Sequence, residues 1–166
     1  MSFRLGIRYA VAMVRMTVIL LALLVVSGCA TGAARPSDPP ATAEVRLISM
    51  SPANGSEISN ATVIVAELEY TIHNFKPGVH YYVAPLFAST KGAGTTFNML
   101  DRIADAPQVS QPRGTVSVRY SVAREIESKD LQRPVTLWFY VMEQIGPGKT
   151  RVIGKSEELM FRTAAG

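Results

Sequence analysis

Residues 62–72 read TVIVAELEYTI, and the order of their side chains indicates a secondary structure. After an apolar opening at 63–65, the side chains alternate between an apolar set (Ala66, Leu68, Tyr70 and Ile72) and a polar set (Glu67, Glu69, Thr71 and His73). Successive side chains of a β-strand point to opposite faces of the sheet. The alternation therefore predicts a strand with one face in a core and the other in water.

Further segments carry a related pattern and are separated by Gly, Pro and Asn at the breaks. We expect additional strands at 45–50, 79–88, 97–103, 114–122, 135–145 and 149–163. The segment 97–103 is either a short strand or an irregular crossing, and the last strand is expected to be interrupted by a bulge at 154–158. Residues 123–132 break the alternation and predict one or two helical turns. About seven short strands favour an all-β, two-sheet antiparallel sandwich.

Two turn sequences frame the strand at 62–72. Asn54-Gly55 favours a turn with positive φ, and Lys76-Pro77-Gly78 fits a type II turn. From residue 51 to residue 72 the sequence resembles the opening of bacterial immunoglobulin-like envelope domains. The resemblance covers two strands and implies an immunoglobulin-like sandwich, although the chain has no cysteine pair of the antibody type. A mostly open β-barrel is the alternative architecture.

The beginning of the chain has the features of an export signal. Three arginines (Arg4, Arg8 and Arg15) precede an uncharged apolar run at 17–27, which is too short to span a bilayer. The run leads into Val26-Ser27-Gly28-Cys29, which resembles the lipobox of bacterial lipoproteins. This resemblance implies that residues 1–28 are removed and that Cys29, the only cysteine, becomes a lipidated N-terminus. The alternative is a secretory signal that is cut shortly after the cysteine.

Residues 29–43 are the expected tether, because they hold three prolines and no bulky apolar side chain that could enter a core. The domain itself is expected at 44–166. Ala30 lacks the aspartate associated with inner-membrane retention, so the lipoprotein resemblance implies the periplasmic face of the outer membrane. The membrane is therefore an expected partner through the lipid on Cys29.

Charge and cysteine content narrow the classes of partner. Of the 17 Lys and Arg, three lie in residues 1–28, which contain none of the 13 Asp and Glu; the remainder therefore has 14 basic and 13 acidic residues. A nearly neutral domain without a Lys or Arg cluster lacks the electrostatic surface of a nucleic-acid binder. With its one cysteine used for lipid, the domain has no intramolecular disulfide, so packing has to stabilise it.

No motif in the chain predicts catalysis or a cofactor. Residues 146–150 read GPGKT, but position 143, where a P-loop needs its first glycine, is Glu. His73 and His80 flank a turn, yet no third ligand is visible in the sequence to complete a metal site. A Gly-x-Ser-x-Gly nucleophile elbow is also missing from the sequence. We therefore expect a protein that is not an enzyme and that needs no metal or cofactor.

The predicted strands at 79–88 and 135–145 have apolar or aromatic side chains on both faces. In an immunoglobulin-like order these two strands are neighbours, so their outer faces merge into one candidate binding face. The five side chains predicted for this face are Trp138, Tyr140, Met142, His80 and Tyr82. The alternative is that residues 89–103 or 123–132 fold over the face and bury it.

These patterns predict a lipid-anchored envelope protein that works by binding, either to another envelope protein or to its own copy. A second hypothesis is a carbohydrate or peptidoglycan binder, in which Trp138 and Tyr140 stack on sugar rings. Thr136, Gln144 and His80 are the polar side chains that the sequence offers beside them. A metal-binding protein or an enzyme is the third hypothesis.

Overall fold

The structure, a computed structural model, describes residues 39–102 and 105–163. The predicted signal segment, Cys29 and most of the tether lie outside the described residues. The strands are β1 (Thr42–Ser51), β2 (Glu57–Ile58), β3 (Val63–His73), β4 (Tyr81–Ala88), β5 (Thr96–Phe97), β6 (Gln108–Val109), β7 (Arg113–Ser121), β8 (Val135–Gly146), β9 (Lys149–Lys155) and β10 (Leu159–Thr163). A single turn of helix, α2 (Ala123–Ile126), lies between β7 and β8.

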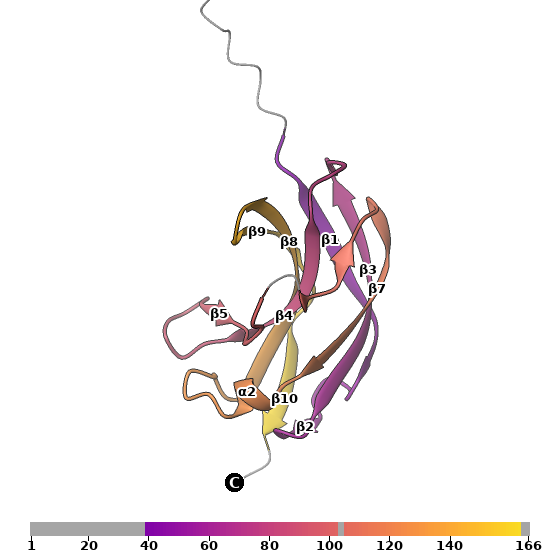
Figure 1. The fold of residues 1–166 in the computed structure, drawn as a ribbon. Helices are drawn as coiled ribbons and strands as arrows, with labels where there is room; N and C mark the ends of the chain where they lie inside the picture. The colour runs from indigo at the N-terminus through magenta and orange to yellow at the C-terminus, as the bar shows by residue number, and fades with distance from the viewer. Residues whose placement is uncertain (1–38, 103–104, 164–166) are drawn as a thin grey trace, which may run out of the picture. The chain divides into compact units, whose positions relative to one another are not determined.

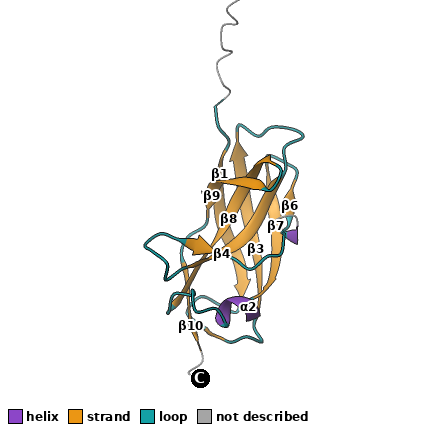
Figure 2. Ribbon diagram, turned by 60° about the vertical axis from the view of Figure 1, so that its left-hand side comes forward, coloured by secondary structure: helices purple, strands orange, loops and turns teal. Residues whose placement is uncertain are grey.

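The strands form two sheets that face each other (Figure 1; Figure 2). One sheet has the order β1-β3-β7, and the other has the order β2-β10-β8-β4-β5, with β6 paired to β4 and β9 paired to β8. The pairs are antiparallel except that β2 runs parallel to β10. The first, second and fifth of the predicted strands share one sheet, and the third, sixth and last share the other, as in an immunoglobulin-like sandwich. The predicted fold class is confirmed.

The long strands lie where the sequence predicts them, with ends that differ by a few residues. The segment predicted at 97–103 is mostly the irregular crossing, because β5 ends at Phe97. The helical turns predicted at 123–132 are limited to α2. Two short strands, β2 and β6, were not predicted, because two residues are too few to show a period.

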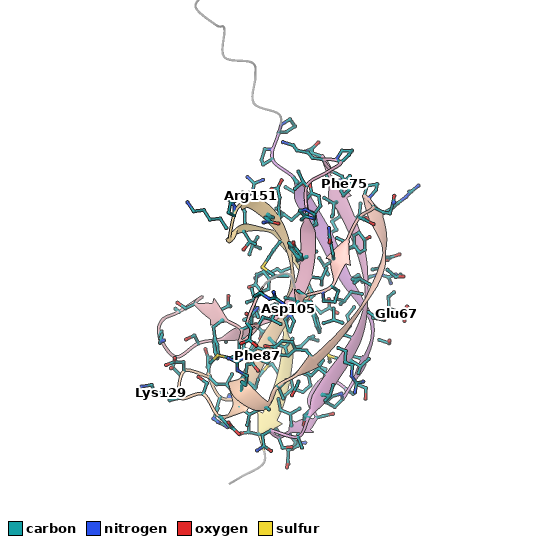
Figure 3. The ribbon with its side chains drawn as sticks, in the orientation of Figure 1. Glu67, Phe75, Phe87, Asp105, Lys129 and Arg151 are labelled. Atoms are coloured by element: carbon teal, nitrogen blue, oxygen red, sulfur yellow. The ribbon has the colours of Figure 1, made fainter. Side chains whose placement is uncertain are left out.

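The outer face of β3 is polar, as the alternation predicts. Glu67 projects away from the sandwich (Figure 3). Arg46 on β1 donates to Glu69 across the strand pair, with 2.7 Å between Nη2 and Oε2. On the same face, Nε2 of His73 lies 3.2 Å from Oε1 of Glu44. These groups are exposed, so the face is hydrated.

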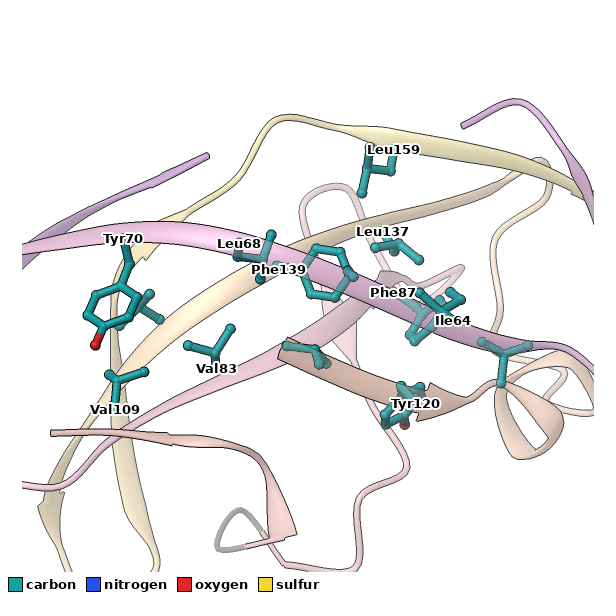
Figure 4. Close-up of a cluster of buried hydrophobic side chains, with 14 of the residues drawn as sticks. Ile64, Leu68, Tyr70, Val83, Phe87, Val109, Tyr120, Leu137, Phe139 and Leu159 are labelled. Carbon is teal, nitrogen blue, oxygen red and sulfur yellow. The ribbon is translucent and has the colours of Figure 1, made fainter. Parts of the chain in front are cut away.

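The inner face of β3 lies in the main core between the two sheets (Figure 4). Its apolar residues are at most 5% exposed: Ile64, Ala66, Leu68, Tyr70 and Ile72. The facing sheet contributes Val83, Phe87, Leu137, Phe139 and Leu159, which are at most 2% exposed. The buried residues that the structure describes in this core all lie between Ala41 and Phe161, so a chain that begins after Cys29 contains all of them.

The last strand is interrupted where the sequence predicts a bulge, between Lys155 and Leu159. The buried Ser156 holds this break against β8, because its hydroxyl accepts the Phe139 N–H at 3.0 Å and donates to the Glu157 carbonyl at 2.8 Å. Just before the break, Gly154 touches the beginning of β1. A Cβ at Gly154 would lie 2.7 Å from the carbonyl carbon and 2.9 Å from the Cβ of Ala43. Only glycine fits there without a shift of the backbone.

Candidate functional site

The outer faces of β4 and β8 merge into one surface, because the two strands are paired along their length. Tyr82 lies opposite Met142, Ala84 opposite Tyr140, and Leu86 opposite Trp138. The predicted side chains are thus brought together on neighbouring strands. Their exposure, however, differs sharply from one end of the surface to the other.

The prediction that the whole face is open is wrong for Tyr82 and Met142. Tyr82 is 7% exposed and Met142 is 5% exposed, and they form a second small core with Ala84 and Ala106, against which Leu100 packs. The covering chain is the stretch 98–102 and 105–107, which crosses the strands after β5. Burial of the face under residues 89–103 is one of the alternatives that the sequence leaves open. In the structure, residues 105–107 also cover the face.

A buried polar cluster fastens the covering segment to the opposite sheet. The Met99 N–H donates to Oε1 of Glu125 at 2.7 Å, and the Tyr120 hydroxyl donates to the same oxygen. Glu125 is fully buried on α2, and its Oε2 has no hydrogen-bond partner among the described residues. Burial, and then the neighbouring Glu125 carboxyl, raise the pKa of Tyr120. Outside this cluster, Arg124 pairs with Asp101 at 2.8 Å.

His80 remains exposed at the edge of the face. Its Nδ1 lies 2.6 Å from Nε2 of Gln108, and its ring lies 6.4 Å from the ring of Tyr82. The second histidine, His73, lies on the other sheet and contacts Glu44 instead. Within the described ranges, no group of three or more His, Cys, Asp or Glu side chains is arranged to hold a metal ion.

The open end of the face forms a groove of about 240 Å³ around Trp138 and Tyr140. The two rings are half-buried and meet edge to face, with 6.5 Å between their centroids and 75° between their planes. Nζ of Lys155 lies 5.4 Å from the centroid of the Trp138 ring. The other residues that line the groove are Ala88, Gly94, Thr95, Thr96, Gln132, Thr136 and Glu158.

Three separate segments build the polar side of this groove. The loop before β5 and the loop before β8 are joined at their bases, because the Gln132 N–H donates to the Ala88 carbonyl at 3.0 Å and the Lys91 ammonium pairs with Asp130 at 2.8 Å. Lys155 is the last residue of β9, and Glu158 lies in the break between β9 and β10. Amide, hydroxyl, ammonium and carboxylate groups therefore meet at one aromatic wall.

The sequence prediction found the aromatic wall but missed most of its polar neighbours. Of the three polar side chains considered beside the rings, only Thr136 lines the groove. Gln132, Lys155 and Glu158 are brought there by loops and by the strand break, and no spacing in the sequence relates them. Glu158 is the only carboxylate among the lining residues, so the groove lacks the pair of carboxylates that glycoside hydrolysis normally uses.

A second depression, of about 410 Å³, lies on the hydrated face of the β1-β3-β7 sheet. Its charged residues are Glu44, Arg46 and Glu69, and Arg46 is already paired with Glu69. It has no exposed aromatic ring against which a ligand could stack. The groove at Trp138 is therefore the better candidate for a binding site.

The glycine-rich sequence at 146–150 forms the turn between β8 and β9 and is followed by a strand, so it has no helix to point at a phosphate. Within residues 39–102 and 105–163, no helix has the length and apolar character needed to cross a membrane. Comparison of the chain with protein-family models, with curated proteins and with solved structures finds no match.

Proposed function

We propose that this chain is a lipid-anchored protein of the outer membrane, facing the periplasm, that binds a glycan without catalysis in the groove at Trp138 and Tyr140. The observation that carries the glycan proposal is the meeting of two half-buried aromatic rings with the side chains of Gln132, Lys155 and Glu158. Ligand sites typically combine apolar and aromatic walls with a few fixed polar groups. The lipid anchor rests on the resemblance of residues 26–29 to a lipobox.

The shape of the surface favours a glycan over a flat protein partner. A stable protein interface buries roughly 800 Å² on each partner. The covering segment removes Tyr82 and Met142 from the surface, so what stays open is a concave site of about 240 Å³. A sugar ring presents an apolar face to an aromatic ring and hydroxyl groups at its rim. The groove offers matching donors and acceptors around its rings.

Each polar residue has a distinct part in the proposal. The Gln132 amide can donate to one sugar hydroxyl and accept from another. The Lys155 ammonium is a donor, and it lies close enough to Trp138 to stay near the aromatic wall when a ligand enters. Glu158 accepts from hydroxyl or N-acetyl N–H groups.

The fluorescence of Trp138 tests this proposal directly, because it is the only tryptophan in the chain. The full-length protein in detergent is titrated with soluble peptidoglycan fragments and with an N-acetylglucosamine trimer. We expect a saturable change in emission that is at least tenfold weaker in Tyr140→Ala and Gln132→Ala. Arg119→Ala, on the hydrated face of the other sheet, is the control and should titrate like the unchanged protein.

Photo-crosslinking in intact cells separates the two kinds of partner. A photoreactive residue at position 138 or 140 should give no discrete protein adduct if the groove takes a glycan. A discrete protein adduct from these positions, but not from position 119, together with an unchanged Trp138 emission in the titration, would refute the glycan proposal in favour of a protein partner.

A further inference from the structure

The turn between β8 and β9 carries exposed apolar side chains that no part of the fold explains. Ile145 is 58% exposed and Val152 is 49% exposed. Pro147 and Lys149 lie between them, and both are also exposed. We call residues 144–152 the hairpin tip. Ile145 and Pro147 lie at the turn itself, whereas Val152 lies farther back along β9, opposite Met142. An exposed Ile and Pro beside an exposed Lys at the end of a hairpin form a candidate contact surface.

The hairpin tip lies at the end of the sandwich where the described chain begins. β9 touches β1 at Gly154 and Ala43, next to the first strand residue, Thr42. The neighbouring turn after β3 also holds the incoming chain, since Nδ2 of Asn74 donates to the Pro40 carbonyl at 3.2 Å. The tip is therefore a close neighbour of the point at which the chain from Cys29 enters the domain.

Most of the charges at this end are basic, and the exposed carboxylate of Glu44 is paired with His73. Arg151 pairs with the buried Glu143. Lys149 and Lys76 have no carboxylate within salt-bridge distance in the described part of the chain. Lys76 belongs to the same end, because its N–H donates to the Tyr81 hydroxyl at 3.1 Å and Tyr81 lies opposite Glu143 on β8. Lys149 is exposed at the turn, and Lys76 is partly exposed at the same end of the sandwich.

We propose that the hairpin tip is a membrane-contact element that binds anionic phospholipid headgroups. Ile145 and Pro147 at the turn enter the headgroup region, while Lys149 and Lys76 meet the phosphates. The residues between Cys29 and Thr42 number 12, so the chain spans at most about 45 Å when fully extended. A tether of this length raises the effective concentration of the tip at the bilayer, so that a weak contact becomes populated.

This inference uses the proposed lipid anchor, and its test is designed so that the two can fail separately. A chain of residues 30–166, which contains every core residue that the structure describes, is attached by an N-terminal polyhistidine tag to vesicles with a nickel-chelating lipid. The vesicles hold phosphatidylcholine with or without 30 mol % phosphatidylglycerol. An environment-sensitive fluorophore is placed on a cysteine introduced at position 145, and nitroxide lipids serve as quenchers.

We expect quenching at position 145 in the vesicles that contain phosphatidylglycerol. Lys149→Gln should lower the ratio of bound to unbound tip about fivefold, which is the usual effect of one basic residue at an anionic surface. Lys129→Gln is the matched control, because Lys129 is exposed at the far end of the domain from Arg151 (Figure 3). A fluorophore at position 129 should stay unquenched.

Equal quenching at 145 and 129, or equal effects of Lys149→Gln and Lys129→Gln, would overturn the inference. The proposed anchor is checked separately by the mass of the mature N-terminal peptide, which reveals whether Cys29 carries lipid. An unmodified Cys29 refutes the anchor and leaves the vesicle result standing.

Discussion

Replacing Tyr120 by Phe is expected to lower the free energy of unfolding by about 2 kcal/mol. The change removes the hydroxyl that donates to Oε1 of Glu125 and lies 3.2 Å from the Met99 amide nitrogen. Glu125 is fully buried, and its other oxygen already lacks a partner among the described residues. Loss of a partner by a buried polar group costs about 1–3 kcal/mol, because water cannot replace it.

The matched control is Tyr82→Phe, which makes the same chemical change elsewhere. The Tyr82 hydroxyl donates to Oε1 of Gln144 at 3.2 Å, and that amide is partly exposed. Water can replace this bond, so we expect a loss of about 0.5 kcal/mol. The difference between the two losses in free energy of unfolding measures the effect of the burial of Glu125.

A double-mutant cycle tests whether Tyr120 and Glu125 act as a unit. Glu125→Leu removes the carboxyl group at nearly constant volume, and the double variant removes both polar partners. The loss in the double variant should be smaller than the sum of the single losses by about 1 kcal/mol or more. The assay is urea unfolding followed by Trp138 emission, with the slope against urea unchanged. Additive losses, or a Tyr120→Phe loss no larger than that of Tyr82→Phe, would refute the reasoning.

Two further predictions concern the glycine beside Ala43 and the pKa of Tyr120. Gly154→Ala should lower the free energy of unfolding in urea by about 1–3 kcal/mol, because the added Cβ meets the Ala43 backbone. Gly146→Ala is the control and should leave the free energy of unfolding nearly unchanged, because its Cβ would meet nothing within 4 Å. Equal losses in the two variants would contradict the close approach of Gly154 to Ala43. Burial raises the pKa of Tyr120, so with rising pH the unfolded chain releases this proton before the folded chain does. The contribution of Tyr120 to the free energy of unfolding should therefore be fully present below about pH 10 and decrease above it. Urea midpoints measured between about pH 8 and about pH 11 should fall less steeply with pH in Tyr120→Phe than in the unchanged protein. Parallel curves for the two proteins would contradict this cause.

The sandwich could be predicted because two of its long strands, β3 and β7, have a clear period of two. In β3 and β7 one set of side chains is buried by the facing sheet and the other is wet, and this difference is visible in the residue types. Strand ends and the short strands β2 and β6 depend on pairing partners far away in the chain. Local patterns carry no signal for such pairings.

The candidate site was only half predictable for a related reason. Trp138 and Tyr140 were visible because β8 breaks the apolar–polar alternation. Whether that face is open depends on the path of residues 98–107, which in turn depends on a hydrogen bond from Met99 to the buried Glu125. A charged residue type in a short helical turn gave no sign that its side chain would be buried. Non-local contacts of this kind decided which part of the face became a groove.

The path of β1 has a mechanical consequence for a domain held by its N-terminal end. β1 begins beside the hairpin tip and pairs with β3 from Thr42 opposite His73 to Ser51 opposite Val65. β10 ends at the other pole of the sandwich (Figure 1). A force between an anchor and a load gripped at that far pole runs along β1, so it shears all the bonds of this ladder together instead of unzipping them singly. Resistance to forced unfolding is governed by the unfolding rate, and a ladder loaded in shear has to fail as a whole. With the proposed lipid anchor at its N-terminal end, the domain would thus be suited to transmit tension from that anchor to a load at its far pole.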